Sequence, residues 1–392
     1  MNYSLVKRPV WAEINLDNIE KNFKSVKEIV GKDVKVAAVI KSDAYGLGAV
    51  EIAPIFEKNG ADYFAVATLT EGIQLRRRHR EIPIMILGYT PVEIIGDVIE
   101  NDIEQTVYTK DQAMAFNHVA REYGKKIKLH INIDSGMNRL GFRPSEKAID
   151  DIEYICTKLE YVDVVGIFTH FAVADETDKS FSRKQMDKFS YVIEEIEKRD
   201  IDIPLKHVSN SAGIIDMPEY NFNMVRAGII LYGCYPSEFV EQDKLEIEPV
   251  INLKAEISYV KEVPKGEGIS YGLTYTTNDE KRIATLPIGY GDGFSRLLSG
   301  KGKAICKDHI VPIVGRICMD QCMIDVTGLD VNVGDVATLY GSEEKSSISI
   351  DSVAKSLGTI NYEVLCMIHK RVPRIYIKEG EVVKTKDYVL ME

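Results

Sequence analysis

Short hydrophobic runs alternate with longer amphipathic segments over the first 235 residues of the chain. In the longer segments, such as SFSRKQMDKFSYVIEEIEKR (residues 180–199), apolar residues recur every three or four positions, which predicts helices. Eight short runs predict strands: residues 34–41, 63–67, 82–88, 104–108, 127–134, 162–171, 205–210 and 222–228. Parallel strands need helical crossovers, and eight of them can close a sheet, so the pattern predicts an α/β fold with a (β/α)8 TIM-type barrel. A doubly wound open sheet is the alternative.

The pattern changes after Tyr235. From about residue 250, short alternating runs separated by Gly, Asp and Asn predict β-strands joined by turns, and one helical stretch at residues 349–371 interrupts them. We therefore expect a barrel over residues 12–240, followed by a mostly β C-terminal domain over residues 241–392 that the opening residues 1–11 could join. No Gly/Ser-rich linker separates the two domains, which predicts that they pack together.

Composition narrows the class of partner. A formal net charge of −11 argues against nucleic acid and anionic membranes, both of which favour basic surfaces, so we expect a small-molecule partner. No segment approaches the ~20 apolar residues of a membrane span, and the N-terminus carries no signal-peptide pattern, which predicts a cytoplasmic protein. The six cysteines show neither a disulfide framework nor metal-ligand spacing, so no metal site is expected.

Lys41 is the first candidate for chemistry. It ends the apolar run of residues 34–40 and opens the glycine-bearing segment KSDAYGLG. A lysine held where a buried strand meets a loop can lose its proton and form a Schiff base with a carbonyl cofactor. The alternative is a lysine that extends from the strand end into water.

The barrel prediction places further polar residues at the same edge as Lys41. Catalytic groups of such barrels sit where strands end, and the loops after the seventh and eighth strands often hold phosphate. Those loops are SNSAG (residues 209–213) and RAGI (residues 226–229), whose small residues let backbone N–H groups approach an anion, and Ser211 adds a hydroxyl. Arg139, His170 and Arg226 also follow or end predicted strands.

Each of these residues also has a simpler interpretation. His170 could be a hydrogen-bonded core histidine, and Arg139 could form a surface ion pair. In the C-terminal half, a lone tyrosine such as Tyr271 is commonly a packing residue, because aromatic side chains favour strands.

Together the motifs resemble alanine racemase, a pyridoxal-phosphate enzyme with an N-terminal barrel and a C-terminal β domain that acts as a head-to-tail homodimer. The resemblance runs nearly end to end and rests on nine segments in the family's order: VIKSDAYGLG, DSGMNRLGF, FTHFA, SNSAG, VRAGIILYG, SYGLTY, IGYGDGF, VGRICMDQ and TINYEVLCMIHKRVPRIY.

The resemblance implies a role for each matching residue. Lys41 would bind pyridoxal 5′-phosphate covalently and act as one base, and Tyr271 of the partner subunit would act as the other. Further cofactor contacts would come from Tyr45, His170, Ser211, Arg226, Gly228, Ile229 and Tyr362. Arg139 and Met319 would bind the substrate carboxylate, and Tyr290 would line the substrate entrance.

These residue types suit racemisation of L-alanine and D-alanine, which the family uses to supply D-alanine for peptidoglycan. The α-proton leaves one face and returns on the other, so two bases on opposite faces are useful. Tyrosine has a reference pKa of ~10, and an adjacent arginine favours its ionised form. Arg226 has no proton to give up at physiological pH, so we expect it to keep the pyridine nitrogen unprotonated and to limit side reactions.

One position departs from the family pattern. Members often carry a carbamylated lysine two residues before the aspartate of the D-S/T-G-M motif, and this chain has Asn132 there. We expect a bound anion such as chloride, or the oxygen of Asn132, to steady Arg139. A racemase of other or broader specificity, for example for serine, is the nearest alternative. An amino-acid decarboxylase of the same architecture and a non-catalytic cofactor carrier are more distant ones.

Overall fold

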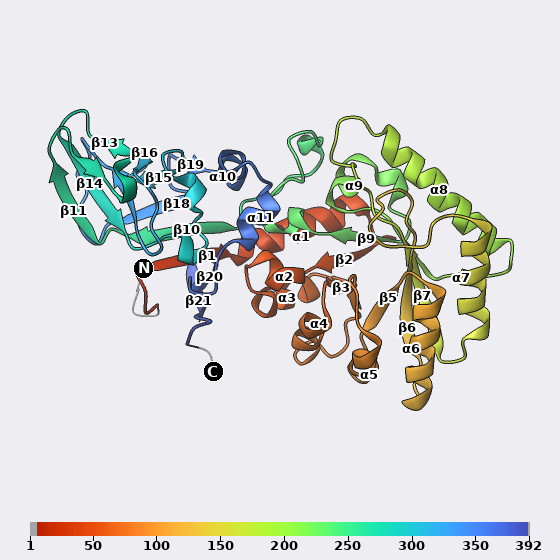
Figure 1. Ribbon diagram of the computed structural model, residues 1–392. Helices are drawn as coiled ribbons and strands as arrows, with labels where there is room; N and C mark the ends of the chain where they lie inside the picture. The colour runs from red at the N-terminus through yellow and green to blue at the C-terminus, as the bar shows by residue number, and fades with distance from the viewer. Residues whose placement is uncertain (1–5, 391–392) are drawn as a thin grey trace. The chain divides into compact units, whose positions relative to one another are not determined.

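A computed structural model describes residues 6–390 of the chain. The chain divides into two compact units. One comprises the chain up to Asn18, Tyr45–Gly48 and the chain from Pro249 onwards, and the other comprises Ile19–Ala44 and Ala49–Glu248 (Figure 1). The boundaries expected at residues 12 and 240 stay predictions.

The unit that contains most of the first 248 residues is a closed barrel of eight parallel strands. The strands are β2 (Lys35–Val39), β3 (Tyr63–Val66), β4 (Ile84–Ile86), β5 (Glu104–Val107), β6 (Ile127–Asn132), β7 (Val162–Phe168), β8 (Leu205–His207) and β9 (Met224–Ala227). Each lies inside one of the eight predicted runs, and β9 pairs with β2 to close the sheet. The predicted barrel is therefore confirmed, and the open sheet is excluded.

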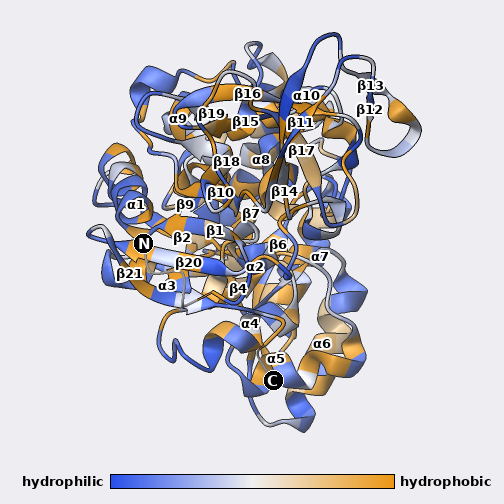
Figure 2. Cartoon of the chain, turned by 90° about the vertical axis from the view of Figure 1, so that its left-hand side faces the viewer, coloured by the Kyte–Doolittle hydropathy of each residue, from blue (hydrophilic) through white to orange (hydrophobic). Residues whose placement is uncertain are grey.

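Helices precede, connect and follow the barrel strands. They are α1 (Leu16–Val30), α2 (Lys41–Tyr45), α3 (Ala49–Lys58), α4 (Leu69–Arg76), α5 (Ile95–Glu100), α6 (Lys110–Glu122), α7 (Glu146–Lys158), α8 (Ser180–Glu197) and α9 (Ser211–Asp216), with short 3-10 turns η2 (Val92–Ile94), η3 (Pro218–Tyr220) and η4 (Ile229–Tyr232). The longer helices are amphipathic, as the mixed colours of α6 illustrate (Figure 2). In α8, most of the recurring apolar positions are buried, Phe189 and Ile196 among them, whereas Phe181 and Tyr191 are exposed.

The other unit is built on a large, mostly antiparallel sheet with the order β11-β14-β17-β16-β15-β18-β10-β1-β20-β21, to which β19 adds beside β18. Its strands are β1 (Val10–Asn15), β10 (Ile251–Glu256), β11 (Tyr259–Val263), β14 (Lys281–Leu286), β15 (Lys303–Cys306), β16 (His309–Val314), β17 (Cys322–Asp325), β18 (Val336–Ser342), β19 (Ser347–Ile348), β20 (Arg374–Lys378) and β21 (Glu381–Lys386). A separate hairpin joins β12 (Gly268–Ile269) to β13 (Tyr275–Thr276). The expectation of a mostly β C-terminal domain is confirmed.

Two details of this unit differ from the sequence prediction or extend it. The single helical stretch expected at residues 349–371 is wrong, because the chain forms two helices, α10 (Ile350–Leu357) and α11 (Asn361–Cys366). Gly358 ends the first of them with a left-handed φ of 74°, the usual conformation of a glycine helix cap. The first strand, β1, pairs with β10 and β20, so residues 10–15 belong to this sheet.

Candidate functional site

Lys41 lies at the C-terminal end of β2, in a strained turn. The four residues that follow it, 42–45, have positive φ values of 55°, 53°, 55° and 55°. A left-handed conformation costs an L-residue roughly 1–2 kcal/mol, so a run of four needs support from its surroundings. The carboxylate of Glu71 gives part of that support, because its Oε1 accepts the backbone N–H of Ser42 at 2.6 Å.

Arg226, near the end of β9, is buried and held by five hydrogen bonds. Its Nη1 donates to Nδ1 of His207 at 2.7 Å and to the carbonyl of the same residue at 3.0 Å. Its Nη2 donates to the carbonyls of Thr169 and Val208 at 2.8 and 2.9 Å, and to Nδ1 of His170 at 3.1 Å. Within residues 6–390, Nε of Arg226 has no hydrogen-bond partner, so it is the nitrogen left for a ligand.

The charge of Arg226 shapes its surroundings. Burial, with a smaller contribution from Arg139, lowers the pKa of Arg226 to about 9, which leaves the guanidinium charged at neutral pH. Burial first, then Arg226, Arg139 and Lys41, hold the pKa of His170 well below its usual value. His170 is therefore neutral, and because its Nδ1 accepts from Arg226, its proton is on Nε2.

The loops after β8 and β9 lie side by side, as expected for an anion site. Ser211 is the first residue of α9, and its Oγ accepts the backbone N–H of Gly228 at 3.0 Å. Asn210 caps α9 by accepting the N–H of Gly213 at 3.0 Å. Ile229, which begins η4, is fully buried. A hydroxyl and backbone N–H groups therefore meet at one point of the barrel edge.

Arg139 lies in the loop after β6 and is exposed, whereas Asn132, at the end of β6, is buried. Asp134 organises the loop, because its Oδ1 accepts the backbone N–H groups of Gly136 and Asn138 at 3.1 and 2.8 Å. No hydrogen bond joins Asn132 to Arg139 among the residues described. The direct support that the Asn132 oxygen could have given Arg139 is therefore not formed.

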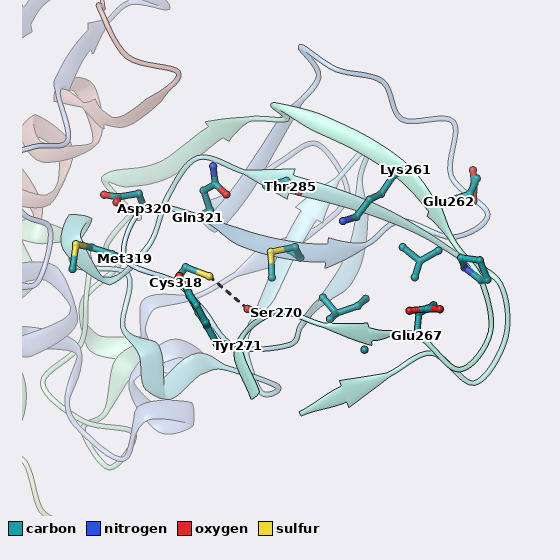
Figure 3. A pocket seen from close by; sticks show the side chains of 15 residues that line it. Lys261, Glu262, Glu267, Ser270, Tyr271, Thr285, Cys318, Met319, Asp320 and Gln321 are labelled. Atoms are coloured by element: carbon teal, nitrogen blue, oxygen red, sulfur yellow. Dashed lines mark hydrogen bonds between the residues drawn. The ribbon is translucent and has the colours of Figure 1, made fainter. Parts of the chain in front are cut away.

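In the other unit, Tyr271 and Met319 line one cavity of about 810 Å³. Figure 3 shows both side chains at one end of this pocket, with Glu267 toward the other end. Tyr271 begins the 3-10 turn η6 (Tyr271–Leu273), and 71% of its surface is exposed. The turn is tightly fitted, since a Cβ on Gly272 would lie 2.7 Å from Nη1 of Arg316.

Tyr290 is tied to the segment that carries Met319 through the backbone. The N–H of Tyr290 donates to the carbonyl of Cys318 at 3.1 Å, and the N–H of the next residue donates to the carbonyl of Met319 at 2.9 Å. Tyr290 begins the 3-10 turn η7 (Tyr290–Asp292), whose last residue is buried and forms a two-pronged ion pair with Arg8 at 2.5 and 2.8 Å. Tyr290 and Met319 thus share one rigid support.

Tyr45 and Tyr362 form another pair in this unit. Their ring centroids are 6.1 Å apart. Burial, followed by the neighbouring Tyr362 and Cys366, raises the pKa of Tyr45, so its hydroxyl keeps its proton and can donate a hydrogen bond to an anion.

The predicted site residues thus fall into two groups. The barrel unit carries Lys41, Arg139, His170, Ser211, Arg226, Gly228 and Ile229, and the sheet unit carries Tyr45, Tyr271, Tyr290, Met319 and Tyr362. Sequence reasoning missed Glu71, His207 and the Arg8–Asp292 ion pair. The capping pattern Thr68-x-x-Glu71 could have drawn attention to Glu71. No local signal links Arg8 to a residue 284 positions away.

Two findings concern ions and membranes. Within residues 6–390, no cluster of three or more His, Cys, Asp or Glu residues could hold a metal ion. None of the helices in the same part of the chain is both long and apolar enough to cross a membrane.

Two family models match consecutive parts of the chain. The alanine racemase N-terminal domain matches residues 14–236, and the alanine racemase C-terminal domain matches residues 250–376. The alanine racemase of Clostridium novyi is 47% identical over 384 residues, which are 97% of this chain and 99% of that protein.

Solved structures agree with these matches. The alanine racemase of Clostridium difficile 630 superposes with a TM-score of 0.95 at 47% identity, covering 98% of this chain and 100% of that one. The alanine racemase of Bartonella henselae, solved with covalently bound pyridoxal phosphate, has a TM-score of 0.85 at 28% identity and covers 94% of this chain and 99% of that one.

Proposed function

This chain belongs to the alanine racemase family, and from that premise we propose that it interconverts L-alanine and D-alanine with pyridoxal 5′-phosphate as its cofactor. It is an isomerase. The observation that carries the proposal is the meeting of Lys41, Arg226 and Ser211 at the carboxyl edge of the barrel, where such folds place their chemistry.

The residues present fit the cofactor. Its phosphate needs hydrogen-bond donors. Oγ of Ser211 accepts the N–H of Gly228 and so keeps its own hydroxyl hydrogen to donate, at the two loops that such barrels use for phosphate. Its aldehyde needs an amine at a strand end, which Lys41 provides. Its ring nitrogen needs a hydrogen-bond donor, and Arg226 has an N–H to spare. Tyr45, His170, Ile229 and Tyr362 complete the proposed set of contacts.

When bound, the cofactor supplies the electron sink that stabilises negative charge at the substrate α-carbon. Lys41 holds the cofactor and moves the α-proton on one face. Tyr271 of the partner subunit moves it on the other, so the proton lost on one side is replaced from the opposite side. The 71% exposure of Tyr271 in one chain favours this arrangement, since an exposed side chain is available to a second copy. The working assembly is accordingly a homodimer.

Arg139 and Met319 receive the substrate carboxylate, Met319 through its backbone N–H, and Tyr290 lines the entrance. The positive charge of Arg139 also favours the ionised form of the tyrosine base. Because no hydrogen bond of the described structure joins Asn132 to Arg139, we propose that an anion such as chloride near these two residues steadies the arginine. Halide-free buffer should then lower the activity, and full activity without halide would contradict the chloride site.

Arg226 sets the reaction outcome. A guanidinium donates a hydrogen bond to the ring nitrogen without giving up the proton, so that nitrogen stays neutral. Negative charge at the α-carbon is then less stabilised, and reprotonation competes well with transamination and decarboxylation. Arg226 therefore favours racemisation over both side reactions.

The remaining sequence expectations stay proposals of the same kind. They are the domain division at residues 240 and 241, the cytoplasmic location and the supply of D-alanine to peptidoglycan.

The direct test incubates the cofactor-saturated protein with L-alanine in D₂O. Nuclear magnetic resonance follows α-deuteration, and chiral chromatography follows handedness. We expect deuterated D-alanine at a rate well above that with L-serine. Deuterated D-serine formed faster than D-alanine would move the assignment to another racemase. Release of carbon dioxide without racemisation would move it to a decarboxylase.

A further inference from the structure

A line of buried polar side chains runs through the barrel interior and ends on Arg226. Oε2 of Glu104 lies 2.6 Å from Nε2 of His130, and Nδ1 of His130 lies 3.2 Å from Nε2 of His207. Nδ1 of His207 lies 2.7 Å from Nη1 of Arg226. Glu104, His130 and His207, here called the relay, come from strands β5, β6 and β8, and at most 3% of any of them is exposed.

The relay has one consistent proton arrangement, and Arg226 dictates it. Guanidinium nitrogens donate and do not accept, so Nδ1 of His207 must accept, and its proton lies on Nε2. That N–H donates to Nδ1 of His130, whose own proton must then be on Nε2. The His130 N–H donates in turn to an ionised Glu104. If Glu104 were protonated or His130 were charged, Nδ1 of His130 would donate to Nε2 of His207. The proton of His207 would then lie on Nδ1 and face the N–H of Arg226, so that two donors would meet.

The surrounding packing is shaped for this line. A Cβ on residue 166 would lie 2.2 Å from Nδ1 of His130, so the glycine found there makes room for the imidazole. The ring of His207 stacks on Phe168 with centroids 4.8 Å apart. Burial, followed by Arg226 and His130, also holds the pKa of His207 well below its usual value, in keeping with a neutral ring.

We propose that the relay positions Arg226, fixing the rotation of its guanidinium so that Nε faces the cofactor ring nitrogen. Two neutral imidazoles connect the buried positive charge of Arg226 to the negative charge of Glu104. The relay residues therefore act on the reaction through Arg226 and not by touching substrate. This inference rests on the role proposed for Arg226 in racemisation, and its test separates the two.

The first readout is the protonation pattern, which requires no turnover. Protein labelled with ¹⁵N-histidine, with and without cofactor, should show both His130 and His207 neutral with the proton on Nε2. A proton on Nδ1 of His207, or a charged imidazole at either position, would overturn the relay. If the wild-type protein did not racemise alanine, the proposed function would be overturned instead. The histidine tautomers are measured without turnover, so the two outcomes can be told apart.

The second readout is kinetic. We expect Glu104→Leu to lower kcat by roughly tenfold to a hundredfold through misplacement of Arg226, with KM changed by less than about threefold. Glu104→Gln keeps an oxygen that accepts from His130 and should recover most of kcat and the Nε2 tautomer of His207. If Glu104→Gln lowered kcat as much as Glu104→Leu, or if neither lowered it, the positioning role would be refuted.

A matched control comes from a second carboxylate–histidine pair. Glu57 and His79 lie 2.5 Å apart in the same unit, and no hydrogen bond of the described structure connects them to Arg226. Glu57→Leu should leave kcat and the His207 tautomer unchanged. An equal fall in kcat for Glu57→Leu and Glu104→Leu would show a general loss of stability and would contradict the relay.

Discussion

The two halves of the proposed site are built in opposite ways. In the barrel unit, Arg226 is 3% exposed and makes five hydrogen bonds, whereas Tyr271 of the sheet unit is 71% exposed at the start of a short turn. Fixed surroundings hold a group in one orientation before a ligand arrives. We infer from the comparison that the proposed cofactor half is fixed within one chain, and that the proposed tyrosine half is exposed for a second chain to use.

The two proposed bases nevertheless share one feature. Lys41 is followed by four residues with left-handed backbone, and Tyr271 lies between Ser270 and Gly272, whose φ values are 66° and 70°. Left-handed backbone is costly for residues other than glycine, and it persists only where the surrounding structure holds it. Strain beside both bases therefore indicates that their directions are set by the fold, whatever their exposure.

The largest effect should come from Lys41→Ala. This change removes both the cofactor link and one base, so we expect racemisation to fall by at least about a thousandfold and the visible absorption of bound cofactor to disappear. Absorption spectra and a coupled assay of D-alanine formation measure the two effects. Lys35→Ala, at the opposite end of the same strand, is the control and should change neither. Normal turnover by Lys41→Ala would show that Lys41 neither binds the cofactor nor acts as a base.

Tyr271→Phe should cost roughly a hundredfold in kcat while leaving the cofactor absorption intact, because one base is lost and the barrel half stays complete. Tyr259→Phe alters another exposed tyrosine of the same unit and should have no effect. Exchange of the α-proton in D₂O should survive for one alanine enantiomer in Tyr271→Phe and be lost for the other. Equal exchange of both enantiomers at the original rate would show that Tyr271 is not a base.

Arg226→Glu tests whether the buried half also controls the outcome. A carboxylic acid at this position can share a proton with the ring nitrogen, so transamination relative to racemisation should rise by roughly tenfold or more. Chromatography of pyruvate and pyridoxamine phosphate against D-alanine measures the ratio, with circular dichroism to confirm that the variant folds. An unchanged ratio of transamination to racemisation in a folded variant would refute the proposed role of Arg226.

Ser211→Ala should have a smaller effect. One hydrogen bond at the phosphate end is removed, so the dissociation constant of the cofactor should rise by roughly tenfold, with kcat at saturation nearly unchanged. The control is Ser182→Ala, which removes a buried hydroxyl that has no partner in the described structure. If the two variants bound cofactor equally well, Ser211 would not belong to the phosphate site.

The smallest effect concerns pH. The pKa values of His170 and His207 are lowered in the folded chain, so the unfolded chain binds more protons below about pH 6.5. The free energy of unfolding should therefore fall as the pH drops from 6.5 towards 5. Urea unfolding across this range measures the change. Stability that rose over the same interval would contradict neutral histidines around Arg226.

Features formed by neighbouring residues could be predicted from the sequence, whereas features formed by residues far apart in the chain could not. All eight barrel strands were predictable because each is a local hydrophobic run, and Lys41 followed from its place at the end of one. The left-handed turn after Lys41 has little signal in its residues, since serine, alanine and tyrosine rarely adopt that conformation. Glu104, His130 and His207 were not singled out because their relation is formed by the closed barrel and spans 103 residues between the first and the last.

The central claim is that each active site joins Lys41 of one chain to Tyr271 of the other. The most direct test mixes the two impaired variants, Lys41→Ala and Tyr271→Phe, unfolds them together and refolds them. A mixed dimer contains one site with both bases, so the account predicts recovery of about a quarter of wild-type activity, half of the dimers carrying one complete site out of two. No recovery from a mixture that forms dimers would show that the two residues act within one chain, and would contradict the account.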